Sequence, residues 1–184
     1  MFHSIHGRRT LAAISVLAAG LAAGACKGKH SQPAVKNEEP PPVAQTVSSF
    51  KMNDEAASTQ LLKGFYVLEN NAWRWTAGSF TVLLKPPAGA AVRGGTVSLA
   101  FTLPEIVITK LKKVTITASV GTTKLKPQTY TKSGPATYSA DIPADLLAKD
   151  AVTLDFELDH SLPPGSVDMR ELGVIATAVG IESK

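Results

Sequence analysis

Hydrophobic and polar residues alternate along most of the chain after residue 60. In Val97–Leu103 the odd-numbered positions are apolar, and in Val114–Val120 and Val152–Asp159 the even-numbered positions are apolar. Successive side chains of a β-strand point to opposite faces of a sheet, so the alternation predicts strands with one buried and one exposed face. Further strands are predicted at Lys63–Glu69, Trp73–Thr76, Phe80–Lys85, Thr123–Tyr130, Thr137–Ile142 and Leu172–Ile181.

Residues that interrupt strands separate these segments at fairly regular intervals. They are Pro86-Pro87-Ala88-Gly89, Pro104, Gly121, Ser133-Gly134-Pro135 and Pro163-Pro164-Gly165. About eight or nine strands divided by such turns predict an all-β fold, with two antiparallel sheets packed face to face as a jelly-roll-like or immunoglobulin-like sandwich. We expect this domain to cover residues 60–184.

Three segments depart from the plain alternation. Leu172–Ile181 is apolar on both faces, which predicts a central strand or one whose outer face is covered by the amino-terminal strand. Pro143–Ala148 is the only helical turn predicted within the domain. A further short helix over Asp54–Leu62, before the first strand, is weakened by Ser58 and Thr59.

The first 25 residues have the pattern of a secretory signal peptide. Arg8 and Arg9 form a positive region, Leu11–Ala25 is uncharged and rich in Ala and Leu, and small residues precede Cys26. The apolar run is shorter than the roughly 20 residues that span a bilayer as a helix. The segment therefore predicts export, with cleavage next to Cys26.

Cys26, the only cysteine of the chain, follows Ala23-Gly24-Ala25 at the predicted cleavage position. This segment resembles the signal of bacterial lipoproteins, although Ala23 stands where that family usually has Leu. The resemblance implies palmitate-type lipidation of Cys26 and membrane attachment, with more than one acyl chain as stable anchoring requires. Lys27 favours the outer membrane, facing the periplasm, if the host has one. The alternative is an ordinary secreted protein with a chance cysteine.

Residues 26–59 predict a disordered tether between the lipidated cysteine and the domain. The segment is rich in Lys, Gln, Asn, Glu, Ser and Pro, and it includes Glu38-Glu39-Pro40-Pro41-Pro42. Such a composition buries too little apolar surface to offset its ordering entropy.

Charge and motif content exclude several classes of function. Residues 60–184 contain 13 Lys or Arg against 11 Asp or Glu, whereas nucleic-acid binding needs a concentrated basic face. A single cysteine leaves no internal disulfide. The chain has no Walker loop, nucleophile elbow or dinucleotide fingerprint. The sequence thus predicts a protein that is not an enzyme and has no cofactor, no metal site and no nucleic-acid partner.

Two phrases near the ends of the predicted domain contain most of its unusual residues. They are Gly64-Phe65-Tyr66-x-x-Glu69-x-x-x-Trp73-Arg74-Trp75-Thr76 and Asp168-x-Arg170-Glu171-Leu172-Gly173-Val174. Together they resemble a bacterial β-sandwich module, jelly-roll-like in form, that occurs beside glycosyltransferases and in envelope polysaccharide proteins. The resemblance covers roughly residues 62–182 and implies a carbohydrate-binding-like sandwich in a cell-envelope context.

The same residues allow two interpretations, as a ligand site or as a structural latch. They are Tyr66, Glu69, Arg74, Trp75, Asp168, Arg170 and Glu171. In a ligand site, the aromatic rings would stack on sugars while the charged groups hydrogen-bond hydroxyls. In a latch, Arg74 would pair with one of the acids and hold the first strand beside the last, while the tryptophans fill the core.

One further group of acids could bind a cation. Asp155, Glu157 and Asp159 share one face of a predicted strand, and Ca²⁺ takes six to eight oxygen ligands. The alternative is a solvated face paired with lysines such as Lys110, Lys112 and Lys113.

The sequence as a whole predicts a lipid-anchored envelope protein whose non-catalytic sandwich binds carbohydrate for an envelope polysaccharide system. The alternative is a protein-interaction module that docks on a membrane enzyme or transporter and binds no sugar.

Overall fold

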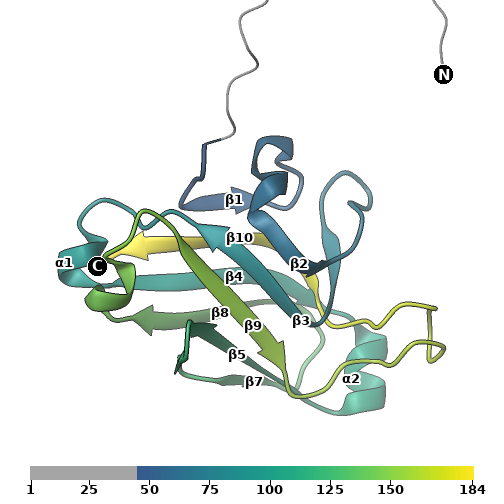
Figure 1. Cartoon of the computed structure of the whole chain (residues 1–184). Coiled ribbons are helices and arrows are strands. Elements are labelled where there is room, and N and C mark those ends of the chain that lie inside the picture. The colour runs from purple at the N-terminus through teal and green to yellow at the C-terminus, as the bar shows by residue number, and fades with distance from the viewer. Residues whose placement is uncertain (1–44) are drawn as a thin grey trace, which may run out of the picture. The chain divides into compact units, whose positions relative to one another are not determined.

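Ten antiparallel strands form two sheets in the part of the chain that the structure, a computed structural model, describes, residues 45–184 (Figure 1). Sheet A consists of β1 (Ser49–Lys51), β10 (Ile175–Ser183), β4 (Gly95–Leu103) and β8 (Gly134–Ile142). Sheet B consists of β2 (Leu61–Phe65), β3 (Arg74–Leu84), β9 (Val152–Leu158), β5 (Val114–Val120), β6 (Thr123–Lys124) and β7 (Gln128–Tyr130). The predicted all-β fold with two antiparallel sheets is confirmed.

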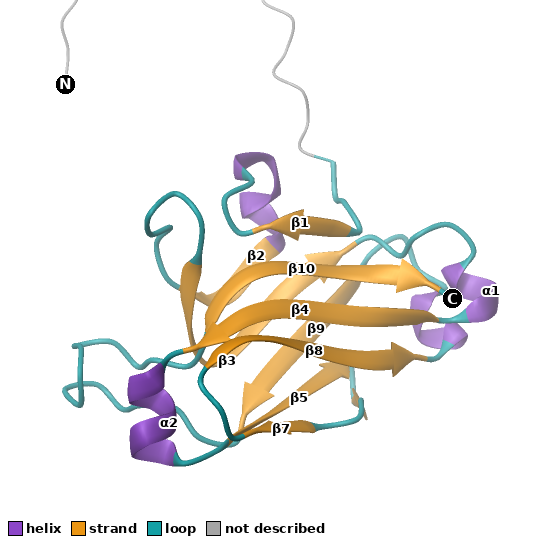
Figure 2. Cartoon of the chain, turned by 180° about the vertical axis from the view of Figure 1, so that it is seen from behind, coloured by secondary structure: helices purple, strands orange, loops and turns teal. Residues whose placement is uncertain are grey.

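The sheets are joined by β3, which changes sheet along its length. Its first residues, Arg74 and Trp75, pair with β10 of sheet A, whereas residues 79–84 pair with β9 of sheet B. We call this the closed side of the sandwich. Figure 2 shows β10, β4 and β8 as one layer in front of β9, β3 and β5. On the opposite, open side, β8 has only β4 as a strand neighbour, and β6 and β7 have only β5.

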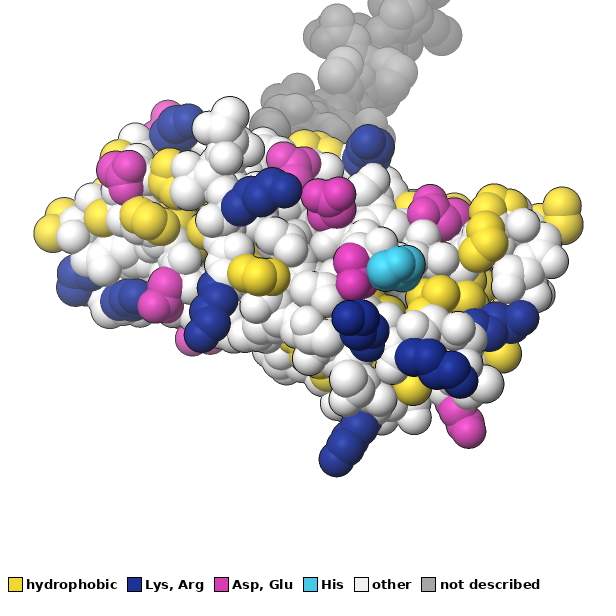
Figure 3. Space-filling model, turned by 90° about the horizontal axis from the view of Figure 1, so that it is seen from below, with side chains coloured by type: hydrophobic (Ala, Val, Ile, Leu, Met, Phe, Trp, Pro, Cys, Tyr) yellow, Lys and Arg dark blue, Asp and Glu magenta, His cyan; other side chains and the backbone are white. Residues whose placement is uncertain are grey.

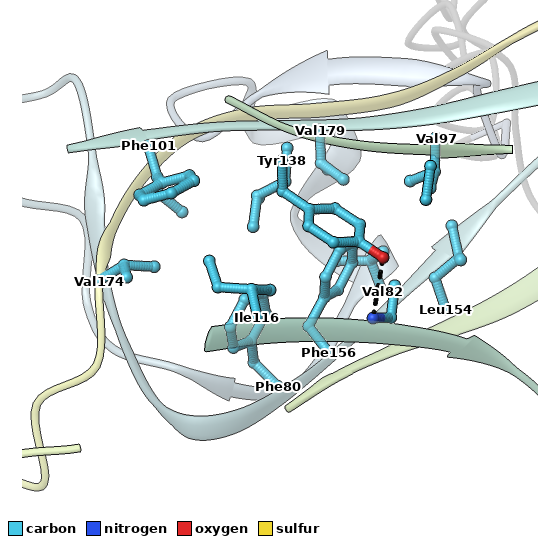
Figure 4. Packing of buried hydrophobic residues seen from close by; sticks show 14 of the residues in the cluster. Phe80, Val82, Val97, Phe101, Ile116, Tyr138, Leu154, Phe156, Val174 and Val179 are labelled. Atoms are coloured by element: carbon cyan, nitrogen blue, oxygen red, sulfur yellow. Dashed lines mark hydrogen bonds between the residues drawn. The ribbon is translucent and has the colours of Figure 1, made fainter. Parts of the chain in front are cut away.

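The side chains between the sheets form one core, and Tyr138 crosses it. Phe80 and Phe156 stack with ring centroids 5.0 Å apart, and the Tyr138 ring meets Phe156 edge-on. The Tyr138 hydroxyl accepts a hydrogen bond from the Ala118 amide (3.1 Å) and donates one to the Lys126 carbonyl (2.9 Å) (Figure 4). Burial raises the pKa of this hydroxyl. Tyr138 therefore links sheet A to sheet B through its polar end.

Strand predictions were most accurate where the alternation was regular. β5 has the predicted bounds Val114–Val120, and β4 and β9 differ from prediction by at most two residues at one end. The strands predicted at 73–76 and 80–85 are one strand, β3. The strand predicted at 123–130 is broken into β6 and β7, because Leu125 turns into the core and Pro127 has no amide to donate.

The helical prediction was incomplete. η2 (Ala144–Leu147) lies where a helical turn was expected, but α1 (Ala90–Arg93) and α2 (Glu105–Leu111) were missed. The β-branched run in α2 looks like a strand, yet it packs at helical spacing: Val107 is buried, and Ile108 and Leu111 are partly buried against the core. The short helix suggested before the first strand is present as η1 (Glu55–Gln60).

The domain boundary predicted at residue 60 lies too late. β1 pairs with β10, and Phe50, Met52 and Ala57 are buried in the core. The buried Gln60 side chain bonds both main-chain groups of Val47 and the Leu83 carbonyl, which ties residue 47 to β3. The tether prediction over residues 45–59 is therefore wrong, since this stretch carries apolar side chains that the sandwich buries. The rest of the predicted tether and the signal segment lie outside the described residues.

Candidate functional site

The first predicted phrase forms a tight turn between β2 and β3. Glu69 and Trp73 make an isolated antiparallel bridge, and the Ala72 amide donates to the Glu69 carbonyl at 3.1 Å. Asn70 and Asn71 both have positive φ, at 50° and 51°. Asn tolerates this left-handed conformation better than most residues, so two consecutive asparagines favour the turn.

Arg74 bonds to backbone carbonyls and does not form the predicted ionic latch. Its Nε donates to the Met52 carbonyl (3.2 Å), and its Nη1 donates to the Tyr66 carbonyl (3.0 Å). Arg74 thus fastens the end of β1 and the start of the turn to β3. No carboxylate among residues 45–184 lies within ion-pair distance of it.

Arg170 is the arginine that links the two phrases. Its Nη1 lies 2.9 Å from Glu69 Oε1, and its Nη2 lies 2.8 Å from Asp168 Oδ2. The guanidinium also lies over the Tyr66 ring, 5.1 Å from the centroid. Hydrogen bonds from the side chain and then the backbone of Arg170 lower the pKa of Asp168 to about 2. The side-chain hydrogen bonds to Asp168 and then to Glu69 raise the pKa of Arg170. An ionic latch is present, with a different arginine from the one predicted.

Residues 171–174 approach the backbone of β3 very closely. The Val174 amide donates to the buried Thr76 Oγ1 (3.1 Å), and the Gly173 amide donates to the Thr76 carbonyl (2.7 Å). A Cβ added to Gly173 would lie 2.6 Å from the Ala77 carbonyl oxygen, so the phrase requires glycine there. Glu171 accepts a hydrogen bond from Ser161 Oγ (2.5 Å) rather than from Arg74.

The aromatic residues of the first phrase are half-buried, so they are neither a full core nor an open platform. Tyr66, Trp73 and Trp75 all have intermediate exposure, and Trp75 packs against the core. One face of the Tyr66 ring faces the Arg170 guanidinium. The contacts of this phrase are thus mainly within the protein.

The acids predicted at 155, 157 and 159 have no lysine within ion-pair distance among residues 45–184. Asp155 accepts a hydrogen bond from Thr81 (2.7 Å), and Asp159 pairs with His160 (3.4 Å) and accepts from the Thr115 amide (2.7 Å). Within residues 45–184, no group of three or more His, Cys, Asp or Glu side chains could hold a metal ion.

Both signs of charge occur on the face of the domain that is seen from below. Figure 3 shows several Lys and Arg side chains gathered toward the lower right, whereas Lys and Arg are mixed with Asp and Glu over the rest of this face. The described residues also contain no helix long and apolar enough to cross a membrane.

A groove of about 410 Å³ lies on the outer face of sheet A. Its lining residues are Ser49, Phe50, Lys51, Ser98, Ala100, Thr137, Ala178, Val179, Gly180 and Glu182. The volume is within the range of small-ligand sites, about 300–1,000 Å³. β10 is a central strand, as one of the two predicted alternatives stated, with β1 and β3 on one side and β4 on the other. The amino-terminal strand does not cover its outer face, because β1 lies beside β10 in the sheet.

Strand register explains the shape of the groove. Two rows of outward side chains cross sheet A from β1 to β8: Lys51, Ala178, Ala100, Thr137; and Ser49, Gly180, Ser98, Ser139. The two central strands, β10 and β4, contribute Ala, Gly and Ser, while β1 and β8 contribute hydroxyls and a lysine. The floor of the groove is therefore low over β10 and β4, and the walls of the groove, from β1 and β8, carry polar groups.

The two ends of the groove differ in charge. Lys51 stands in the first row, and a third row contains Glu182, Thr96 and Asp141. Lys184 Nζ lies 2.8 Å from Asp141 Oδ2, and Thr96 Oγ1 donates to Asp141 Oδ1 at 3.2 Å. The hydrogen bond from Lys184 and then that from Thr96 lower the pKa of Asp141.

Sequence reasoning missed the groove, because its residues belong to four strands far apart in the chain. The alternation of Phe50 and Met52 could have revealed β1. The small outward residues of β4 and β10 could have indicated a low surface, but which strands are neighbours is not readable from one sequence.

Comparison with known proteins adds little to this geometry. No family model and no curated protein matches the chain. Among solved structures, the chain is similar to one described as "CBM4 structure and function", with 14% identity and a TM-score of 0.33 over 73% of this chain and 85% of that chain. The assignment to the all-β class follows from the strands themselves.

Proposed function

We propose that this chain is a lipid-anchored, non-catalytic protein of the cell envelope whose sandwich binds carbohydrate in the groove of sheet A. The observation that carries the proposal is the groove itself: an open channel along two central strands, with a floor of small side chains and walls with hydroxyl groups. Hydroxyls both donate and accept hydrogen bonds, which suits a ligand rich in hydroxyls.

The location of the groove favours a sugar over a peptide. Peptides that bind sheets usually add a strand to an exposed edge and use main-chain hydrogen bonds. The groove lies over β10 and β4, whose main-chain groups already pair within the sheet. At the β8 edge, the Gln128 side chain bonds the Ser139 amide and carbonyl, and Tyr130 bonds the Thr137 carbonyl. The available ligand contacts are therefore side-chain groups.

One acid beside the groove, Asp141, favours binding without hydrolysis. A glycosidase needs a general acid whose pKa is raised so that it holds a proton near neutral pH. Lys184 instead lowers the pKa of Asp141 and keeps that carboxyl ionised.

The anchor is proposed from the sequence, at Cys26 behind its signal segment. In cells that process lipoproteins, Cys26→Ser would leave a soluble or uncleaved product. A variant that remained processed and membrane-bound would contradict the lipid anchor.

The groove is tested by filling it. Ala100→Trp places a large side chain on the floor and would abolish binding of soluble cell-wall or surface polysaccharides, measured by affinity electrophoresis or a glycan array. Thr117→Trp makes a comparable enlargement on the outer face of β5 in sheet B, so this control would bind like the wild type. Equal binding by both variants would contradict the groove as the site, and no wild-type binding at millimolar sugar would contradict carbohydrate binding.

A second candidate function, docking on an envelope protein, is favoured by exposed apolar side chains on the latched loops. Val67, Val167 and Met169 are 71%, 52% and 84% exposed, and the Arg170 latch joins their loops. Crosslinking from position 166, in the same loop, in native envelopes would then give one dominant protein product that Met169→Ser weakens. A diffuse set of products would argue against this function.

A further inference from the structure

We infer that the groove of sheet A selects an acidic polysaccharide with spaced carboxylates, one of which pairs with Lys51. This inference rests on the proposed carbohydrate binding and adds the chemical class of the sugar and its placement. It follows from the uneven charge along the groove.

Lys51 is a cation without a protein partner in the described structure. It is exposed on the wall formed by β1, and no carboxylate within residues 45–184 lies within ion-pair distance of it. Lys184, at the other end, is already paired with Asp141. An anionic ligand group is thus complementary to the Lys51 end of the groove.

The opposite end disfavours a second carboxylate nearby. Glu182 and Asp141 flank Thr96 there. Lys184 pairs with Asp141 and Lys126 also acts on it at longer range, whereas no cation among residues 45–184 lies within ion-pair distance of Glu182. Residues 178 and 182 on β10 are four positions apart, which is about 14 Å along a strand at about 3.4 Å per residue. A carboxylate bound at Lys51 therefore requires a neutral, hydroxyl-rich or amide-bearing sugar toward Glu182.

Between the charged ends, the groove can contact sugar rings closely. Ala178, Ala100 and Gly180 place no long side chain above the sheet, and Ser98 and Thr137 supply hydroxyl groups. The ligand that fits this arrangement alternates acidic and neutral sugars. A polymer with a carboxylate on every ring would place like charge beside Glu182.

Hyaluronan oligosaccharide, which alternates acidic and neutral sugars, and its carboxyl methyl ester are suitable probes. They share a backbone and differ in charge, so isothermal calorimetry with the full chain at low salt isolates the contribution of the carboxylate. We expect the acid to bind about three- to fivefold more tightly than the ester, the scale of one exposed ion pair. Salt at 0.5 M would remove most of this preference.

Variants assign the preference to specific side chains. Lys51→Gln would make acid and ester bind equally. Glu182→Gln would tighten binding of the acid, because it removes a like charge. Lys124→Gln, which removes an exposed lysine from β6 of sheet B, would keep the wild-type preference.

The outcomes separate this inference from the proposed function. Equal binding of acid and ester to the wild type, with both lost in Ala100→Trp, would overturn the charge selection and leave carbohydrate binding intact. A preference for the acid that survives in Lys51→Gln would also overturn it. No binding of either probe or of the polysaccharides tested above would overturn both.

Discussion

The closed and open sides of the sandwich are held together in different ways. On the closed side, main chain meets main chain: β3 pairs with both sheets, and residues 173–174 bond Thr76 directly. On the open side, no strand within residues 45–184 connects the sheets, and the side chains of Tyr138, Tyr130 and Gln128 bridge the gap. Backbone contacts leave no room for larger residues, whereas side-chain bridges depend on single polar atoms.

This difference shows how the conspicuous phrases of the sequence should be interpreted. The arginines and acids of the two phrases lie on the closed side and bond within the protein. Arg170 pairs with Glu69 and Asp168, whereas Arg74 bonds backbone carbonyls and Glu171 bonds Ser161. The groove, by contrast, is built from alanine, serine and glycine residues that no motif singles out. Substitutions on each side test this difference between backbone contacts and side-chain bridges.

The largest effect is expected for Gly64→Ala on the closed side. Gly64 has φ +75°, and an added Cβ would lie 2.1 Å from the Ser79 carbonyl oxygen. Backbone must move, so we expect a loss of about 4 kcal/mol or more in the free energy of unfolding, measured with urea. Gly121→Ala is the control, with φ +58° and nothing within 4 Å, and should cost about 1–2 kcal/mol. Equal losses would refute the role of close backbone approach.

Tyr138→Phe tests the open side. It leaves the Ala118 amide and the Lys126 carbonyl without their partner, which should cost about 1–3 kcal/mol in urea unfolding. Tyr130→Phe removes a hydroxyl whose partner on β8, the Thr137 carbonyl, is near solvent, so water can replace it and the loss should be smaller. A larger loss in Tyr130→Phe would reverse the proposed order of the two bridges.

The latch on the closed side should produce a dependence of stability on acid pH. The pKa of Asp168 falls from its ordinary 3.8 to about 2 in the folded protein. Its stabilising contribution is fully present above about pH 4 and is lost as the pH falls through about 2. The urea midpoint of the wild type should decrease over this range more than that of Asp168→Asn. Parallel curves for the two proteins would show that the Arg170 pair is not coupled to folding.

The smallest effect on stability is expected for Gln128→Leu. The Gln128 carboxamide bonds Ser139 N (3.3 Å) and O (2.7 Å), as a neighbouring strand would. Its loss should change the free energy of unfolding by less than about 1 kcal/mol but expose an unpaired edge, which favours association. Sedimentation velocity would then show concentration-dependent self-association of Gln128→Leu. The control Thr129→Leu, which also introduces a leucine on β7, would not self-associate. Association of both variants would point to added hydrophobicity instead.

The sequence predicted the elements better than their partners. Regular alternation located β4, β5 and β9, because burial on one face imposes that pattern locally. α2 was not predicted, because its β-branched residues favour strands. Burial of Val107 against the core outweighs this strand propensity. For the candidate site, the two phrases indicated that an arginine and acids meet across the fold. Arg170 makes the ion pairs, whereas Arg74 bonds the Met52 carbonyl. This division depends on distances between side chains that the sequence does not contain.

The position of β1 has a practical consequence for any shortened form of the protein. A version beginning at the aromatic phrase would still contain both conspicuous phrases of the domain. It would lack Lys51 and one wall of the groove, and it would uncover Val179, which pairs with Phe50 in the intact sheet. A protease that cuts between residues 52 and 60 would have the same effect if the released strand dissociated. Loss of ligand binding in such a fragment would therefore reflect the missing strand, even where the remaining sandwich stayed folded.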